Sequence, residues 1–432
     1  MTGPSRRPAG TARARARLAV RAVTVSAAAA LVLAAAACSS SSSSGGAGSA
    51  SSAPAAGTGS AAAGGGGAAS GGTGSATGSP IEIGSIIDLT GVDATSGTAQ
   101  QAGMSYFLQQ LNSSGGVNGH PLKVTYCDAA STPQGAGQCA QQFASLSSHI
   151  VVAQTSDPPT RGALPYLTKD LVVSVDPILL PKAGTNTFQA AGAGSTIAAA
   201  LISQVKKANL HTLGVLYTSD TSGTHQLQAA QDAAKAAGIT VVSQPQTPGT
   251  TDVTPQLLKL KSSGAEVIYL ASIGSNTAAA VSSYKTLGLT IPVVAGAAAV
   301  TNSFLKSLSG GIPSNLYGVS QLIGDTSGLS PAIVSAWSQY RTAFTKFSNQ
   351  PVDTQTTSAQ YVGCVVLTAL KASPAYVVSD MTQALKTATI PCLGAQEKYS
   401  IPGLNVVAGQ PAAVTKAGAS ASDGWGPFQG NL

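Results

Sequence analysis

The sequence predicts an α/β protein of two lobes, each a mainly parallel sheet with helices on both faces. The first observation is a strand–helix–strand unit within residues 81–126, in which an apolar run ends at Thr90-Gly91 and a helix follows. The apolar residues of this helix recur at i, i+3, i+4 and i+7; they are Met104, Phe107, Leu108 and Leu111. This spacing is typical of an amphipathic helix, and such a unit requires parallel strands joined by a right-handed crossover.

The second observation is that strand and helix patterns alternate along the rest of the chain. The expected strands cover residues 150–153, 171–175, 213–217, 239–242, 267–271 and 291–295. The expected helices cover residues 197–205, 224–237, 255–262, 276–287, 334–347, 356–370 and 381–388. The third observation is the length of 432 residues, which exceeds one ordinary domain. We therefore expect two lobes, with residues 317–322 as a crossover strand between them.

Residues 1–38 are typical of an export signal. An arginine-rich start is followed by an apolar run over residues 22–37, which is short for a membrane span. The run ends in four alanines before Cys38 and is similar to a bacterial lipobox, in which the cysteine carries a lipid. The lipobox prefers leucine three residues before the cysteine, where this chain has Ala35. The alternative is cleavage at an Ala-x-Ala site and free secretion.

Residues 39–79 consist almost wholly of Ser, Gly and Ala, and they predict a flexible linker because they cannot bury a core. The formal net charge of +7 depends on six arginines that precede residue 22. Without them, 17 basic residues face 16 acidic ones. This balance excludes a basic surface for nucleic acid.

Four further cysteines support an exported protein, and they allow three pairings. Cys127 ends a predicted strand and Cys139 lies on the following helix, so a local bridge is expected. Cys364 and Cys392 then pair by elimination. The alternative is four free buried thiols.

Nothing in the sequence favours an enzyme or a metal site. The four histidines have no metal-ligand spacing; they are His120, His149, His211 and His225. The chain has no Gly-x-Ser-x-Gly nucleophile elbow and no Gly-Lys dipeptide, which a P-loop requires. We expect no cofactor.

The order of elements resembles a known family. A strand ending at Leu89-Thr90-Gly91, a helix ending near Leu111, and Gly-Gly-Val-Asn-Gly at 115–119 resemble the opening of the leucine/isoleucine/valine-binding proteins of ABC importers. The resemblance extends to about Leu393 and implies the type I periplasmic binding protein fold, with a hinge of crossover strands. It implies one lobe of residues 80–190 and 322–395, and a second of residues 191–321 and 396–432.

The resemblance also implies a function. A monomer, lipid-anchored through Cys38 on the outer face of the cytoplasmic membrane, would capture a small molecule, an amino acid or related compound, by hinge closure. It would deliver the ligand to the permease and ATPase subunits of an ABC importer. The alternative is a ligand-sensing receptor of the same fold.

Candidate ligand-binding residues follow the strands, because ligands of open α/β sheets bind outside the carboxyl ends of the strands. From this rule and the resemblance, the candidates are Ser96, Thr155, Ser156, Asp157, Asp176, Pro177, Ile178, Asp220, Ser222, Ile273 and Ala298. Ser156 matches the family's carboxylate-binding serine and precedes a helix start, which offers N–H groups to an anion. The alternative for Ser156 is a helix N-cap.

One position departs from the family. The acidic residue that holds the ligand's ammonium falls near Ala298, and residues 295–300 contain no acid. An unpaired buried ammonium is costly, so we expect branched-chain amino acids to bind poorly. Four other aspartates follow strands and could replace the missing acid; they are Asp93, Asp157, Asp176 and Asp220. The alternative for each is a loop or capping residue.

Overall fold

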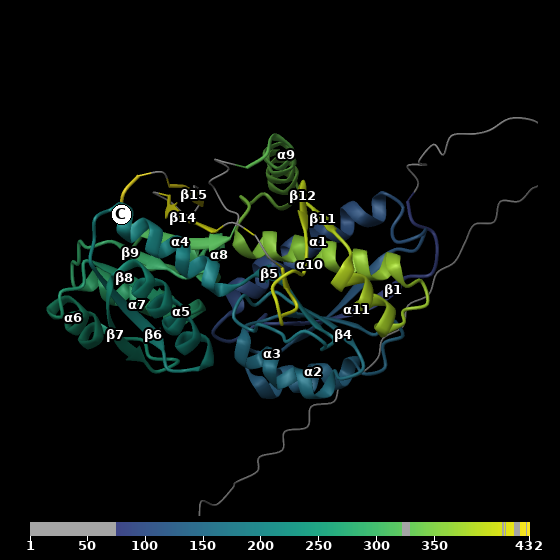
Figure 1. The fold of residues 1–432 in the computed structure, drawn as a ribbon, viewed down its shortest axis with the longest axis horizontal. Coiled ribbons are helices and arrows are strands. Elements are labelled where there is room, and N and C mark those ends of the chain that lie inside the picture. Colours follow the sequence, from purple (N-terminus) through teal and green to yellow (C-terminus); the bar gives the residue numbers. More distant parts are fainter. Residues whose placement is uncertain (1–74, 322–328, 408–409, 411, 419–423, 429) are drawn as a thin grey trace, which may run out of the picture. The chain divides into compact units, whose positions relative to one another are not determined.

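The computed structural model describes residues 75–321, 329–407, 410, 412–418, 424–428 and 430–432 (Figure 1). The predicted export signal with Cys38, and the predicted linker up to residue 74, lie outside this range. In the described part of the chain, no helix has the length and apolar character needed to cross a membrane.

The first sheet contains six strands in the order β13-β5-β4-β3-β1-β2. Their bounds are β1 (Ile81–Ile87), β2 (Leu122–Asp128), β3 (Ile150–Gln154), β4 (Leu171–Ser174), β5 (Thr187–Gly192) and β13 (Val406–Val407). Every pairing among them is parallel. β5 was not expected, because its residues Gln189 to Gly192 are polar or small and carry no strand pattern.

The second sheet contains seven strands in the order β15-β14-β10-β9-β8-β6-β7. Their bounds are β6 (Thr212–Thr218), β7 (Thr240–Gln246), β8 (Val267–Ala271), β9 (Val293–Ala295), β10 (Leu316–Gln321), β14 (Ala412–Ala417) and β15 (Trp425–Pro427). β6 to β10 pair in parallel, and β14 pairs antiparallel with both β10 and β15. Both sheets are therefore mainly parallel, as predicted.

Helices cover both faces of each sheet. The first sheet has α1 (Ala94–Ser113), α10 (Thr354–Ala372) and α11 (Val378–Thr387) on one face, and α2 (Pro133–Phe143) and α3 (Asp157–Ala163) on the other. The second has α4 (Gly194–Lys207) and α5 (Thr221–Ala237) on one face, and α6 (Thr254–Ser262), α7 (Gly274–Thr286) and α8 (Asn302–Ser307) on the other. Alternate strand residues point to opposite faces: Ile83 packs with α1, whereas Ile86 packs with α2.

Further elements flank the first sheet. α9 (Pro331–Ser348) packs on α1, where Tyr106 meets Tyr340 and Phe344 edge to face. β11 (Ile390–Cys392) and β12 (Ala395–Glu397) form a two-stranded antiparallel pair. Disulfides join Cys127 to Cys139, between β2 and α2, and Cys364 to Cys392, between α10 and β11.

The structure places residues 317–321 in the second sheet. We expected a crossover strand between the lobes within residues 317–322; β10 pairs in parallel with β9, Leu316 and Val319 are fully buried there, and the chain passes to the first sheet after it. Leu322 lies outside the described residues. The chain passes between the sheets in three places: after β5, between β10 and α9, and between β13 and β14.

The C-terminal segment contributes to both sheets. We assigned residues 396–432 to the second lobe, and β14 and β15 do extend the sheet there. β13, however, pairs with β5 in the first sheet, where the side chain of Asn405 also donates to the carbonyls of Thr185 and Thr187. The segment therefore ties the two sheets together.

Candidate ligand-binding site

Two glycines allow α1 and α5, which follow the first strand of each sheet, to lie close to that strand. A Cβ atom at Gly97 of α1 would lie 1.9 Å from the carbonyl oxygen of Asp88, and one at Gly223 of α5 would lie 2.0 Å from that of Thr218. Gly97 lies in the first turn of α1 and Gly223 in the first turn of α5. This close approach brings the side chains of the first helical turns to the carboxyl ends of the strands.

A cavity of about 730 Å³ lies at these strand ends. Its walls come from the loops after β1, β3 and β4 of the first sheet, and from α5, β8 and the turn η2 (Ala297–Ala299) of the second. α4 and the start of α10 complete the lining. The cavity is thus shared by both sheets, as the rule for open α/β sheets predicts.

Most of the candidate residues line this cavity. They are Thr155, Ser156, Asp176, Pro177, Ile178, Ser222, Ile273 and Ala298. Ser96, Asp157 and Asp220 do not line it, and each is occupied by a contact within the protein. Ser96 Oγ donates to Asp93 Oδ1 at 2.6 Å and to the carbonyl oxygen of Ala298 at 3.1 Å, so it links the start of α1 to the second sheet.

Asp220 is the N-cap of α5, because its Oδ1 accepts from Gly223 N at 2.8 Å. Asp157 is fully buried at the start of α3, and both of its carboxylate oxygens accept from Arg161 Nε, at 2.8 and 2.9 Å. These contacts favour the capping and structural interpretations of the two aspartates over direct ligand contact.

The start of α3 differs from what we expected of an anion site. Ser156 occupies the N-cap position but makes no capping hydrogen bond through its side chain. Pro158 and Pro159 follow in the first turn and have no N–H groups to donate. The N–H of Thr160 donates to the carbonyl oxygen of Ser156. This helix start therefore offers few donors to a ligand, although its sequence position matches the family's serine.

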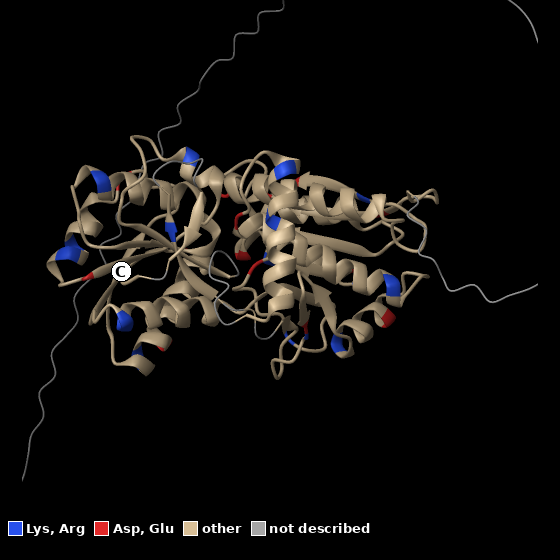
Figure 2. Cartoon of the chain, turned by 90° about the horizontal axis from the view of Figure 1, so that it is seen from above, with Lys and Arg blue, Asp and Glu red and all other residues tan. Residues whose placement is uncertain are grey.

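Two buried acids line the cavity without an ion-pair partner among the described residues. Asp93 and Asp176 are 4% and 5% exposed, and in the described part of the chain neither forms an ion pair. Asp93 accepts from Ser96 Oγ, and Asp176 Oδ1 accepts from Ile178 N at 2.7 Å. Figure 2 shows several acidic segments near the middle of the described chain, with most Lys and Arg toward its periphery.

Burial changes how these acids ionise. Desolvation, with repulsion from Asp157, raises the pKa of Asp176 to about 7. Desolvation and repulsion from Asp88 and Asp176 also raise the pKa of Asp93 well above its usual value. Behind them, desolvation raises the pKa of Asp88 to about 6, although its carboxyl accepts from Thr155 Oγ1. Burial therefore favours the neutral form of these carboxyls and makes their negative charge costly unless a cation lies beside them.

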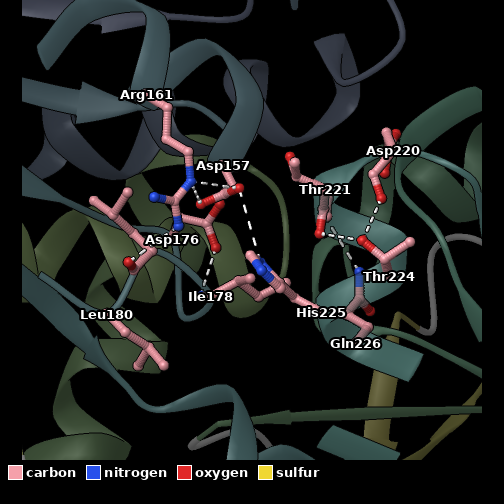
Figure 3. Close-up of polar contacts among 12 residues, drawn as sticks. Asp157, Arg161, Asp176, Ile178, Leu180, Asp220, Thr221, Thr224, His225 and Gln226 are labelled. Atoms are coloured by element: carbon pink, nitrogen blue, oxygen red, sulfur yellow. Dashed lines mark hydrogen bonds and ion pairs between the residues drawn. The ribbon is translucent and has the colours of Figure 1, made fainter. Parts of the chain in front are cut away.

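Figure 3 shows the ion pair between Asp157 and Arg161 at the edge of the cavity. Arg161 lies between Asp157 and Asp176, and its Nη2 donates to the carbonyl oxygen of Leu179 at 3.3 Å. His225 of α5 approaches from the second sheet, with its Nδ1 4.0 Å from Asp157 Oδ2. This contact spans the two sides of the cavity.

Buried amides form another wall. Gln100 Nε2 donates to Gln355 Oε1 at 2.7 Å. Within the part of the chain that the structure describes, Gln100 Oε1 and Thr354 Oγ1 have no hydrogen-bond partner. Gln100 and Thr354 are 3% and 5% exposed and both line the cavity. Buried polar atoms are normally paired, so these groups are suited to contact a bound molecule.

No metal site accompanies the cavity: in the described ranges of the chain, no three His, Cys, Asp or Glu side chains gather closely enough to hold an ion. The apolar part of the lining comes from the loop after β4 and from α4, with Ile178, Leu179, Ile197 and Ala198. The site combines acids, amides and an apolar wall, which suits the binding of a small organic molecule.

The profile of the periplasmic binding proteins matches residues 80–419. The chain belongs to the periplasmic binding protein family. Leu/Ile/Val-binding protein homolog 3 of Brucella melitensis is 27% identical over 202 residues, 45% of this chain and 55% of that protein. The chain spans about half the length of the curated relatives it matches. Within the family, these relatives support the leucine/isoleucine/valine-binding branch that the sequence indicated.

Solved structures share the fold. The branched-chain amino acid transporter substrate-binding protein LivJ of Streptococcus pneumoniae, solved with isoleucine, has a TM-score of 0.65 and 20% identity, covering 78% of this chain and 99% of that one. A fatty acid ABC transporter substrate-binding protein of Thermomonospora curvata also has a TM-score of 0.65, with 17% identity, covering 82% of this chain and 92% of that one. The type I periplasmic binding protein fold predicted from the sequence is confirmed.

The sequence missed several lining residues for a structural reason. Arg161, His225 and Gln226 lie one helical turn beyond candidates at helix starts, and continuing the search by three or four residues would have found them. Thr354 and Gln355 begin α10, which follows a helix rather than a strand, so the strand-end rule does not reach them.

Proposed function

We propose that this periplasmic binding protein captures a small organic molecule, an amino acid or a related compound, outside the cytoplasm and presents it to an ABC importer. The observation that carries the proposal is the shared cavity, in which buried polar groups of α1 and α10 have no partner among the described residues. A molecule that pairs with these groups would recover the cost of burying them. The importer role rests on the family and on the printed names of its relatives.

Capture would proceed by closure of two lobes. The cavity walls belong to two sheets between which the chain passes three times, so a few residues in these connections can absorb a hinge rotation. A ligand that contacts both walls would favour the closed arrangement by its higher affinity for that arrangement. The contact of Asp157 with His225 would tighten on closure because it spans the cavity.

We further propose that the mature protein begins at Cys38 and is held at the membrane by a lipid. This proposal rests on the alanine-rich segment before Cys38 and on the Ser/Gly/Ala-rich segment after it. A tether of this composition would let the binding domain reach a permease in the same membrane.

A thermal-shift screen of amino acids, amides, short carboxylates and aromatic compounds would test the capture function. A ligand at 100 times its Kd stabilises the protein by about 2.7 kcal/mol, which gives a measurable rise in Tm. Gln100→Ala with Thr354→Ala should remove the shift, because it removes two polar contacts in the cavity. A compound that shifts both proteins equally binds elsewhere, and the absence of any shift across the screen would argue against capture of these classes.

A further inference from the structure

The start of α3 lacks the donors that a carboxylate needs. A helix normally exposes four N–H groups at its start. Here these groups belong to Ser156, Asp157, Pro158 and Pro159, and the two prolines have no N–H. The N–H of Ser156 donates to the carboxyl of Asp88, so only that of Asp157 remains, while the N–H of Thr160 makes the first bond within the helix, to the carbonyl of Ser156.

The acids around this point would also repel an anion. Asp88, Asp93, Asp157 and Asp176 all lie at the ends of strands in the first sheet, and all four are buried. Arg161 balances the charge of Asp157, and its Nε–H donates to both carboxylate oxygens. Its Nη2 donates to the carbonyl oxygen of Leu179. The positive charge at this edge is therefore already matched before a ligand arrives.

Asp93 and Asp176 remain as the charged groups that face the cavity from this side. Each carries one hydrogen bond from the protein, so several acceptor positions stay open on the two carboxyls. The unpartnered Oε1 of Gln100, on the helix that Asp93 caps, adds an independent polar group to the same wall.

We propose that the ligand carries a cationic amine and no carboxylate, with the amine held between Asp93 and Asp176. The inference rests on the proposed capture function and specifies its ligand class. An ammonium offers three N–H donors and a positive charge, which match two carboxylates and the free amide oxygen of Gln100. Its apolar part would lie against Ile178 and Ile197, which also line the cavity. A zwitterionic amino acid would bring its carboxylate to a wall of acids.

Matched pairs of compounds test the proposal by calorimetry on the purified protein. The pairs are L-leucinamide against L-leucine, agmatine against L-arginine and cadaverine against L-lysine, with 4-methylpentanoate as a carboxylate without an amine. In at least one pair the amine without a carboxylate should bind, and there it should bind tighter than its amino acid by roughly tenfold or more. Binding of 4-methylpentanoate should be the weakest.

Variants show whether the two acids hold the amine. Asp93→Asn and Asp176→Asn should each weaken the best amine by roughly tenfold to a hundredfold, since each removes one charge-assisted hydrogen bond. Asp380→Asn, at an exposed position in α11, is the matched control and should leave affinity unchanged. The melting temperature of each variant establishes that it folds.

The opposite change provides a gain-of-function test. Pro158→Ala with Pro159→Ala restores two N–H groups at the start of α3, and it should improve binding of 4-methylpentanoate relative to the unmodified protein. No improvement in a folded variant would contradict the role assigned to the prolines.

Different results would contradict the proposed ligand class and the proposed capture function. Tighter binding of an amino acid or of 4-methylpentanoate than of every amine overturns the inference and leaves capture intact. An amine whose affinity does not change in Asp93→Asn or Asp176→Asn also overturns it. If no compound in either arm binds at millimolar concentration, both proposals are contradicted.

Discussion

Asp176 illustrates how a single buried acid can serve binding at the expense of stability. It is 5% exposed, it lines the cavity, and burial raises its pKa from 3.8 to about 7. An acid whose pKa is higher in the folded protein than in the unfolded chain stabilises the fold below the unfolded pKa. That contribution is lost as the pH rises through the folded pKa. The empty protein should therefore lose stability between about pH 4 and pH 7.

Asp176→Asn tests this at the residue scale. At pH 8 the variant should be more stable than the unmodified protein by about 1–3 kcal/mol, because it removes a buried charge. At pH 4 the two proteins should unfold at the same denaturant concentration, because the native carboxyl is then protonated. Chemical denaturation at both pH values measures the difference. A variant that is less stable at pH 8 would show that the charge is compensated in the empty protein.

The sequence predicted which residues lie near the cavity more readily than which contacts they make there. The strand-end rule placed Thr155, Asp176 and Ile273 at the cavity, because all three directly follow strands of the two sheets. Asp157 and Asp220 also follow strands but lie outside the lining, and their partners Arg161 and Gly223 are about one turn further along their helices. Capping and ligand contact use the same residue types, so the sequence alone does not separate them.

At the scale of elements, strands with a clear apolar pattern were predicted and others were not. β1, β3, β4, β6 and β8 have buried apolar residues throughout most of their length. β5 was missed because only Phe188 provides a large apolar side chain, and β13 is too short to carry a pattern. β10 was recognised as a strand and assigned to the second lobe, but its neighbours β9 and β14 could not be read from one segment.

The close approach of α1 to the end of β1 leads us to a prediction about Gly97. In Gly97→Ala, the new methyl group would lie 1.9 Å from the carbonyl of Asp88, so α1 must move away from the end of β1. We expect a loss of about 2 kcal/mol or more in the free energy of unfolding. Ligand affinity should fall as well, because α1 carries Gln100 and is capped by Asp93.

Gly137→Ala is the matched control, because Gly137 lies in α2, outside the cavity lining. Its added Cβ would meet the ring of Tyr166 at 3.0 Å, and this tyrosine is 49% exposed and can shift. Its stability should change by less than about 1 kcal/mol, since alanine favours the helix. Denaturant titrations of both variants measure the contrast, and an equal effect of the two changes would refute the steric argument at Gly97.

Each disulfide joins a strand to a helix. Cys127–Cys139 closes a short loop between β2 and α2, with its Cα atoms 5.6 Å apart. Cys127→Ala with Cys139→Ala should cost about 3 kcal/mol on the chain-entropy account. Thermal unfolding measures this, and a variant as stable as the unmodified protein would show that the bridge adds little.

At the scale of the whole molecule, the first prediction concerns the membrane. If Cys38 carries a lipid, Cys38→Ala should move the protein from the membrane fraction to the medium, because a single charge-free tether cannot hold it. Cell fractionation with antibody detection measures the distribution. Retention of the variant in the membrane fraction would mean that another part of the chain attaches it.

The central claim is that a ligand closes two lobes around the shared cavity, and small-angle scattering tests it most directly. The radius of gyration would be measured for the purified protein alone and with saturating amounts of the tightest compound from the screens. Closure of the two sheets around the cavity predicts a smaller radius of gyration with the ligand. Asp176→Asn, at concentrations that saturate only the unmodified protein, should keep the larger radius. An unchanged radius in the saturated, unmodified protein would contradict capture by closure.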